Sequence, residues 1–176
     1  ADDALLAAQL PRARRALDAI LDDFGVREHG LLVDELPDQD GTAGSLGTHY
    51  WDIVPGGARD AYANVLLLGA LRQAARLERH VGESGRAAEL EALAGRVGET
   101  FRAVFWDEGA GRFIQNVDVT GHRHDYGASY LNLEALAAGL GSESEARRIL
   151  EWLDSGGTLL TDRGLLAPPS GPVEPL

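Results

Sequence analysis

Two helical segments of this chain are apolar around most of their circumference, and they restrict the fold more than any other feature. The first begins near Ala58 and contains the run VLLLGAL, and the second covers Ala128–Leu140, where only Asn132 and Glu134 interrupt the apolar pattern. A helix that is apolar on nearly all sides is buried on nearly all sides. Each of the two segments therefore needs other helices packed around it.

Amphipathic helices alternate with these two segments along the chain. Asp2–Phe24 reads as the first, with a break expected at Pro11 because proline does not fit inside a helix. Arg86–Phe105 reads as the second, since its apolar residues recur at helical spacing. The third follows a capping box made by Ser142 and Glu145.

The two apolar helices begin with similar sequences, which indicates a repeated unit. Tyr62-Ala-Asn64 opens the first helix and Tyr130-Leu-Asn132 opens the second, each after a polar loop. Stacked helical hairpins produce such repeats, because each unit buries its face on the next. The predicted fold class is all-α: a partial α/α toroid of stacked hairpins, with inner and outer helices alternating and one short β-hairpin at Trp106–Asn116. The inner-helix N-termini would open onto one cavity.

Composition limits the partners that the chain could bind. The net charge is −12 and the sequence contains no lysine, which argues against nucleic acid and against anionic membranes. No apolar run is long enough to cross a bilayer. The absence of cysteine excludes a disulfide framework and is compatible with the cytoplasm, without establishing that compartment. We expect residues 1–176 to form a single domain that is an incomplete toroid.

The polar loops in front of the two apolar helices, together with the helix starts, supply the candidate site residues. These residues combine carboxylates, which can transfer protons, with aromatic, amide and imidazole groups, which can hold a ligand. The first loop also contains a long Gly-rich stretch, and long connections in compact domains are usually functional or mobile. The candidates are Tyr50, Trp51, Asp52, Asp60, Asn64, His124, Asp125 and Tyr126.

Two carboxylates, one protonated and one ionised, can act as the acid and the base of a reaction. The rings of Tyr50 and Trp51 could raise the pKa of Asp52 by desolvation and could stack on a ring-shaped ligand, so Asp52 is the candidate acid. Asp125 is the second candidate. Structural interpretations stay open for all three acids: Asp52 as a turn residue or cap, Asp60 as a first-turn carboxylate at the helix end, and Asp125 as the N-cap of the following helix.

Five short segments follow one another along the chain: Thr48–Asp52, Arg59–Asn64, Phe105–Asp107, His124–Gly127 and Leu131–Ala135. In this order they resemble the six-hairpin glycosidases, which are built on an (α/α)6 barrel and hydrolyse glycosidic bonds. The resemblance implies that Asp52 is the general acid and that the outcome is inverting. A full barrel would need a chain roughly twice this length, so further hairpins of a larger chain or a second subunit would complete it.

The predicted function is hydrolysis of an oligosaccharide by an O-glycosyl hydrolase that uses carboxylate acid/base catalysis. Other sugar-active toroid enzymes, such as a phosphorylase, an epimerase or a lyase, are the alternative enzymes. A non-catalytic helical-repeat module that binds a partner on its concave face is the alternative from another class. An enzyme needs Asp52 and Asp125 in one pocket, whereas a binding module leaves them as caps on separate loops.

Neither a metal ion nor a cofactor is predicted. The His-x-His pair at 122–124 does not place two ligands on one helical face, and solvent-facing loop histidines are the simpler interpretation. Asp34, Asp38 and Asp40 suggest a calcium loop, but the EF-hand frame would need an oxygen ligand at Leu36.

Overall fold

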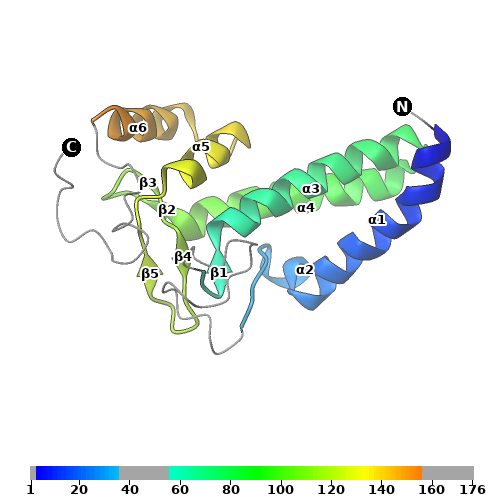
Figure 1. The fold of residues 1–176 in the computed structure, drawn as a ribbon, viewed down its shortest axis with the longest axis horizontal. Coiled ribbons are helices and arrows are strands. Elements are labelled where there is room, and N and C mark those ends of the chain that lie inside the picture. The colour runs from blue at the N-terminus through cyan, green and yellow to red at the C-terminus, as the bar shows by residue number, and fades with distance from the viewer. Residues whose placement is uncertain (1–2, 36–55, 156–176) are drawn as a thin grey trace.

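A computed structural model describes residues 3–35 and 56–155 of the chain. In Figure 1 the long helices α3 and α4 run side by side, α1 lies beside them, and the strands gather at the end where α3 begins. The helices are α1 (Asp3–Asp23), α2 (Val26–His29), α3 (Ala61–His80), α4 (Ser84–Phe105), α5 (Ser129–Ala137) and α6 (Glu143–Asp154). The strands are β1 (Arg59–Asp60), β2 (Trp106–Asp107), β3 (Arg112–Phe113), β4 (Asn116–Val117) and β5 (Arg123–His124).

Helix α1 continues through Pro11, so the break predicted there is wrong. Proline removes the hydrogen bond to the carbonyl four residues earlier, which here belongs to Ala7. Pro11 and Ala7 are both exposed, and water can therefore solvate the Ala7 carbonyl. Gly25, with a φ of 59°, follows the helix as predicted, because glycine adopts this left-handed conformation without strain.

The hydrophobic core lies where α3 packs on α4, and the ends of α1 and α5 close it. Apolar side chains of α3, such as Leu68 and Leu71, are fully buried against Val97 and Phe101 of α4. The prediction of burial on nearly all sides holds only in part, because Leu66 of α3 is 50% exposed and Leu133 of α5 is 48% exposed. Other elements within the described ranges do not cover that side of the two inner helices.

The small sheets make the all-α prediction only partly correct. Strands β2 and β3 form the predicted hairpin, with Trp106 opposite Phe113. The second sheet, in the order β1-β4-β5, was not predicted and pairs Asp60 with Asn116 and Asn116 with His124. Each of its strands has two residues, which is too short for a period-two pattern to be recognised.

Two buried asparagines attach the inner helices to the rest of the fold in the same way. The Asn64 Oδ1 atom accepts the Leu32 N–H at 2.7 Å, and its Nδ2 donates to the Leu32 carbonyl at 3.1 Å and to the Asp60 carbonyl at 2.8 Å. Asn132 repeats this pattern with both backbone groups of Phe113, at 2.8 and 3.1 Å, and with the Ala128 carbonyl at 3.0 Å. We call these two contacts the asparagine clamps.

The backbone beside each clamp is also repeated. The Val33 N–H donates to the Phe24 carbonyl at 3.2 Å, and the Ile114 N–H donates to the Phe105 carbonyl at 2.9 Å. Positions 33 and 114 are 81 apart, as are positions 24 and 105 and the clamped residues 32 and 113. The predicted repeated unit is therefore confirmed, and it includes the segment that follows each outer helix.

The two units differ in the length of the connection that leads into the inner helix. Asn64 and Asn132 are 68 positions apart, whereas the segments they clamp are 81 positions apart, at Leu32 and Phe113. The connection of the first unit is thus 13 residues longer than that of the second. The extra length is not needed to close the repeated unit, because the second unit closes without it.

We predict that Asn64→Ala and Asn132→Ala each destabilise the protein by about 2–4 kcal/mol. Each change leaves a buried backbone N–H and carbonyl without the amide that satisfies them. Urea unfolding of the purified chain measures the loss. Gln73→Ala, an exposed change in the middle of α3, is the control and should cost less than about 0.5 kcal/mol. Clamp variants that unfold like this control would contradict the proposed role.

Candidate functional site

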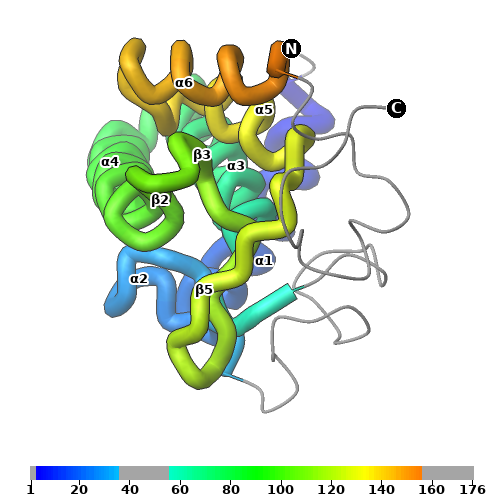
Figure 2. Tube along the Cα trace, turned by 90° about the vertical axis from the view of Figure 1, so that its left-hand side faces the viewer, coloured from blue at the N-terminus to red at the C-terminus, as the bar shows by residue number. Residues whose placement is uncertain are grey.

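The N-terminal ends of the two inner helices lie together. Tyr62 and Tyr130, the second residues of α3 and α5, contact each other edge to face, with ring centroids 5.3 Å apart and an interplanar angle of 81°. In the end-on view of Figure 2 the strands lie in front of α3 and α4, and α5 lies above them. The predicted convergence of the inner-helix starts is therefore present for both inner helices.

Asp60 is the N-cap of α3, and not a residue of its first turn as predicted. Its Oδ1 accepts the Ala63 N–H at 2.8 Å, and the side chain is fully buried. Burial raises the pKa of Asp60 to about 7, and hydrogen bonds from the backbone of Ala63 and Tyr62 oppose the shift. A carboxyl group with such a pKa exchanges its proton near neutral pH, as a general acid must.

Asn64 has a structural role in this fold. Its amide is fully buried and bonds to the backbone of Leu32 and Asp60. Asn64 was predicted to contact the substrate because it lies at the start of the helix, one turn after Asp60. That role stays a prediction, and the contacts seen here explain the residue without it.

The turn between β4 and β5 is organised by Asp118, which the sequence analysis did not single out. Its Oδ1 accepts the backbone N–H of Thr120 at 2.8 Å, the Thr120 hydroxyl at 2.7 Å and the His122 N–H at 2.9 Å. Burial opposes ionisation, but these bonds and the His124 ring hold the pKa of Asp118 well below its usual value. An aspartate two residues before Thr-Gly is a recognisable Asx-turn signal that could have identified it.

His124 links this turn to Tyr126. Its Nε2 lies 2.9 Å from Asp118 Oδ2, and its Nδ1 lies 3.4 Å from the Tyr126 hydroxyl. The rings of His124 and Tyr126 are stacked, with centroids 6.0 Å apart, and the His122 ring meets His124 edge on at 4.6 Å. The structure therefore brings two of the predicted ligand-binding residues, His124 and Tyr126, into one group.

Asp125 is held by a cation, and it does not cap α5. Its Oδ2 lies 2.6 Å from Arg112 Nη2, and its Oδ1 accepts the Gly127 N–H at 2.9 Å. The N-cap of α5 is Ala128, so the N-cap interpretation of Asp125 is wrong. The Arg112 guanidinium in turn lies over the Trp152 ring, 4.6 Å from its centroid. The Asp125 side chain keeps 24% exposure, which leaves it within reach of solvent.

Tyr50, Trp51 and Asp52 lie outside the described residues. That Asp52 shares a pocket with Asp125, as an enzyme would require, therefore stays a prediction.

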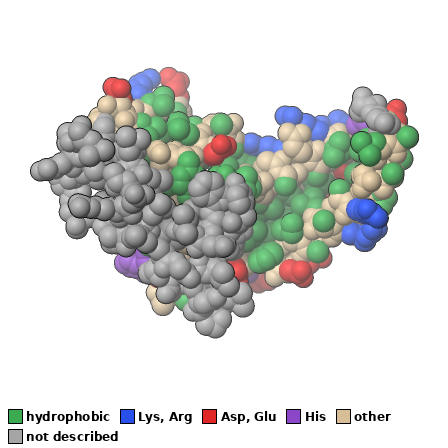
Figure 3. Space-filling model, viewed as in Figure 1, with side chains coloured by type: hydrophobic (Ala, Val, Ile, Leu, Met, Phe, Trp, Pro, Cys, Tyr) green, Lys and Arg blue, Asp and Glu red, His purple; other side chains and the backbone are tan. Residues whose placement is uncertain are grey.

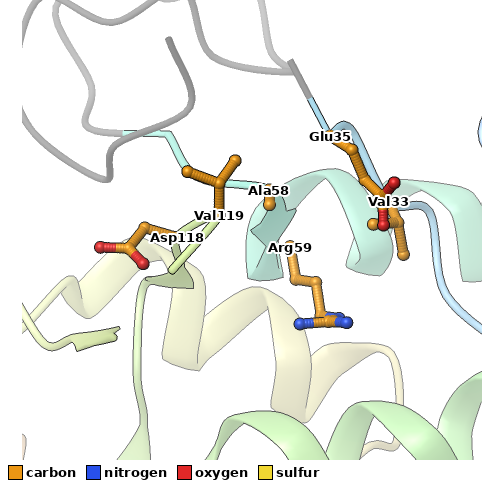
Figure 4. A pocket seen from close by; sticks show the side chains of 6 residues that line it. All are labelled: Val33, Glu35, Ala58, Arg59, Asp118 and Val119. Atoms are coloured by element: carbon orange, nitrogen blue, oxygen red, sulfur yellow. The ribbon is translucent and has the colours of Figure 1, made fainter. Parts of the chain in front are cut away.

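A cleft of about 330 Å³ lies beside the three-stranded sheet. Figure 4 shows its walls, with Val33 and Glu35 on one side and the β4–β5 turn on the other, while the side chains of Arg59 and Asp118 point in different directions. Its volume is in the range of small-ligand pockets. The residues that line it are Val33, Glu35, Ala58, Arg59, Asp118 and Val119.

Within 3–35 and 56–155, no group of three or more His, Asp or Glu side chains is arranged to hold a metal ion. In the same ranges, no helix has both the length and the apolar character needed to cross a membrane.

The fold resembles part of a known glycosidase structure. The crystal structure of a GH78 family rhamnosidase of Bacillus sp. GL1 superposes on 88% of this chain with a TM-score of 0.68 and 23% sequence identity. The chain spans about 15% of the length of that protein. No family model and no curated protein matches the sequence. At this identity the likeness concerns the fold alone, which is of the α/α-barrel type.

We predict that Asp60→Asn removes a pH dependence of stability. Because the pKa of Asp60 is raised on folding, the protonated side chain favours the folded state, and that stabilisation is lost as the pH rises from about 4 through 7. The wild type should lose up to about 1.4 kcal/mol per pH unit in this window relative to the variant. Urea unfolding at pH 5 and pH 8 measures the difference.

Asn is also a good N-cap, so the variant keeps the hydrogen bond to the helix. Asp23→Asn, an exposed change at the end of α1, is the control and should follow the wild type. An Asp60→Asn profile parallel to that of the wild type would show that Asp60 is not titrating in this range.

Proposed function

We propose that this chain is part of a glycoside hydrolase that cleaves an oligosaccharide by carboxylate acid/base catalysis. The observation that carries the proposal is the fold likeness to a glycosidase over 88% of the chain. The residues that the sequence analysis selected supply the chemistry. A neutral substrate also suits a chain with a net charge of −12, because such a surface repels anions.

In this proposal Asp52 is the general acid, and Tyr50 and Trp51 contact the sugar beside it. The length difference between the two units supports a functional role for the connection that contains them. That connection is 13 residues longer than its counterpart, and extra length that the fold does not require is usually retained for function.

Asp125 is the second carboxylate in the proposal. Arg112 lies against one side of it and the Gly127 N–H against the other, so its orientation is fixed. A positioned carboxylate can take a proton from an attacking water molecule. His124 and Tyr126, in the adjoining group, hold sugar hydroxyls, and Asp60, at the cap of α3, holds another.

The remaining part of the barrel packs against the exposed side of the inner helices. Leu66 and Leu133 are about half exposed on α3 and α5, and large apolar side chains on neighbouring helices are expected at a helix–helix contact. Further hairpins of a larger chain, or a second subunit, would cover them.

A non-catalytic sugar-binding module is the second candidate. It is favoured by the fact that Asp60, Asn64 and Asp125 all make contacts that stabilise the fold, as a cap, a clamp and an ion pair. The same residues would then hold the scaffold, and binding would depend on the aromatic side chains alone. The other toroid chemistries, a phosphorylase, an epimerase or a lyase, have no observation here that favours them over hydrolysis.

We predict that Asp52→Asn and Asp125→Asn respond differently to the leaving group. Loss of a general acid slows the hydrolysis of 4-methylphenyl glycosides by about 10²–10⁴-fold. It matters little for 2,4-dinitrophenyl glycosides, whose leaving group needs no proton. Loss of the second carboxylate slows both. Steady-state kinetics on a panel of aryl glycosides that includes α-L-rhamnosides measures these effects.

Asp154→Asn, an exposed change at the end of α6, is the control and should hydrolyse like the wild type. Full activity of Asp52→Asn on both substrates would remove Asp52 from the mechanism. A wild-type chain that binds sugars without hydrolysing any glycoside of the panel would favour the binding module.

A further inference from the structure

We infer that Asp34 is a substrate-contacting carboxylate that, together with Tyr62 and Tyr130, forms a saccharide subsite at the start of the inner helices. The inference rests on the proposed function, in that it assigns a ligand contact to the same sugar-binding end of the molecule. Its basis is the internal repeat, which gives Asp34 the position in the first unit that Gln115 has in the second.

The backbone defines this equivalence. The Asp34 N–H donates to the Ala58 carbonyl at 2.7 Å, and the Gln115 N–H donates to the His124 carbonyl at 2.9 Å. Both residues lie two positions after the clamped residue, which is Leu32 in one unit and Phe113 in the other. Positions 34 and 115 are 81 apart, which is also the spacing of the pairs 24 and 105, 32 and 113, and 33 and 114.

In the second unit the side chain of Gln115 faces the tyrosine pair. Its Nε2 lies 3.2 Å from the Tyr130 hydroxyl, and Gln115 is buried. Burial raises the pKa of Tyr130 to about 12, with a smaller contribution from the charge of Asp60, and the hydrogen bond with Gln115 opposes the shift. The phenol is therefore neutral at any physiological pH and keeps its hydrogen.

The repeat assigns Asp34 the place in the first unit that Gln115 has in the second. Its two neighbours, Val33 and Glu35, both line the cleft drawn in Figure 4. Tyr62 and Tyr130 are the second residues of α3 and α5. The proposal therefore puts Asp34 next to Tyr62, as Gln115 is next to Tyr130.

The two units differ in a way that suits ligand binding. Gln115 is 1% exposed, whereas Asp34 is partly exposed. The buried amide of Gln115 bonds to Tyr130 and so stabilises the fold. A partly exposed carboxylate at the equivalent place can accept hydrogen bonds from a ligand, and bonds to a charged acceptor are stronger than those to a neutral one.

The chemistry of these groups fits a sugar ring. Both tyrosines are partly exposed and meet at 81°, so they present a ring face next to a ring edge. The apolar face of a pyranose packs on such an aromatic face, and neighbouring hydroxyls donate to a carboxylate that carries two acceptor oxygens. The subsite therefore selects neutral polyhydroxylated rings over anions.

The test measures the binding of L-rhamnose, D-glucose and D-mannose to the full chain by NMR titration. It does not require hydrolysis. Asp34→Asn keeps the shape and removes the charge, and it should weaken the best-bound sugar about tenfold or more. Tyr62→Phe keeps the ring and should weaken binding less than Tyr62→Leu, which removes it. Glu35→Gln changes the adjacent residue on the cleft face and should bind like the wild type.

Circular dichroism and urea unfolding verify that each variant is folded. The inference is overturned if none of the three sugars binds to the wild type, if folded Asp34→Asn binds like the wild type, or if Glu35→Gln weakens binding as much. Its failure can be distinguished from failure of the proposed function. Sugar binding that depends on Asp34 without any glycoside hydrolysis would leave the subsite standing and remove the hydrolase. Hydrolysis with a KM unchanged by Asp34→Asn would leave the hydrolase standing and remove the subsite.

Discussion

The side-chain amides of Asn64 and Asn132 are the contacts on which the arrangement of this fold depends. Each amide pairs with the N–H and the carbonyl of one backbone residue, much as a neighbouring β-strand would, and also bonds to the carbonyl of its own helix cap. Inside the protein, polar groups without partners are expensive. The clamp therefore fixes the distance and the rotation between each inner helix and the segment after the preceding outer helix.

This constraint explains why the two helix starts coincide. Each clamp sits four residues after the cap of its helix, so Tyr62 and Tyr130 hold equivalent places in α3 and α5, and their rings are in contact. The repeat then separates two tasks. The clamps and caps hold the scaffold, while Asp34, which stands where the second unit has the buried Gln115, is the residue to which we assign a ligand contact.

Sequence reasoning predicted the parts of the fold that depend on local pattern. The capping box of Ser142 and Glu145 is present, and so is the β2–β3 hairpin. The Tyr-x-Asn repeat was recognised, but the backbone contact that its asparagine makes was not predicted. The partner of Asn64 is Leu32, 32 positions earlier in the chain, and no local pattern shows that contact. The position of Asn64 one turn after Asp60 therefore predicted a ligand contact, where the structure has a contact to the backbone.

The candidate site was predicted less completely than the fold. Grouping His124 with Tyr126 was possible because both lie in one short segment, whereas the ion pair of Asp125 with Arg112 joins a turn to a hairpin. The raised pKa of Asp60 depends on burial, which a sequence shows only indirectly. Asp34 was considered only as part of a calcium loop. Its proposed role depends on its equivalence with Gln115, which the backbone hydrogen bonds define and which no sequence similarity between the two segments shows.

Native-state amide hydrogen exchange at Leu32 and Phe113 tests the clamps most directly. If each clamp holds one backbone residue, both amides exchange only through global unfolding in the wild type. Asn64→Ala should then release Leu32 and leave Phe113 protected, and Asn132→Ala should do the opposite. Rapid exchange of either amide in the wild type, or equal loss of protection at both sites in each variant, would contradict the claim that two separate clamps position the inner helices.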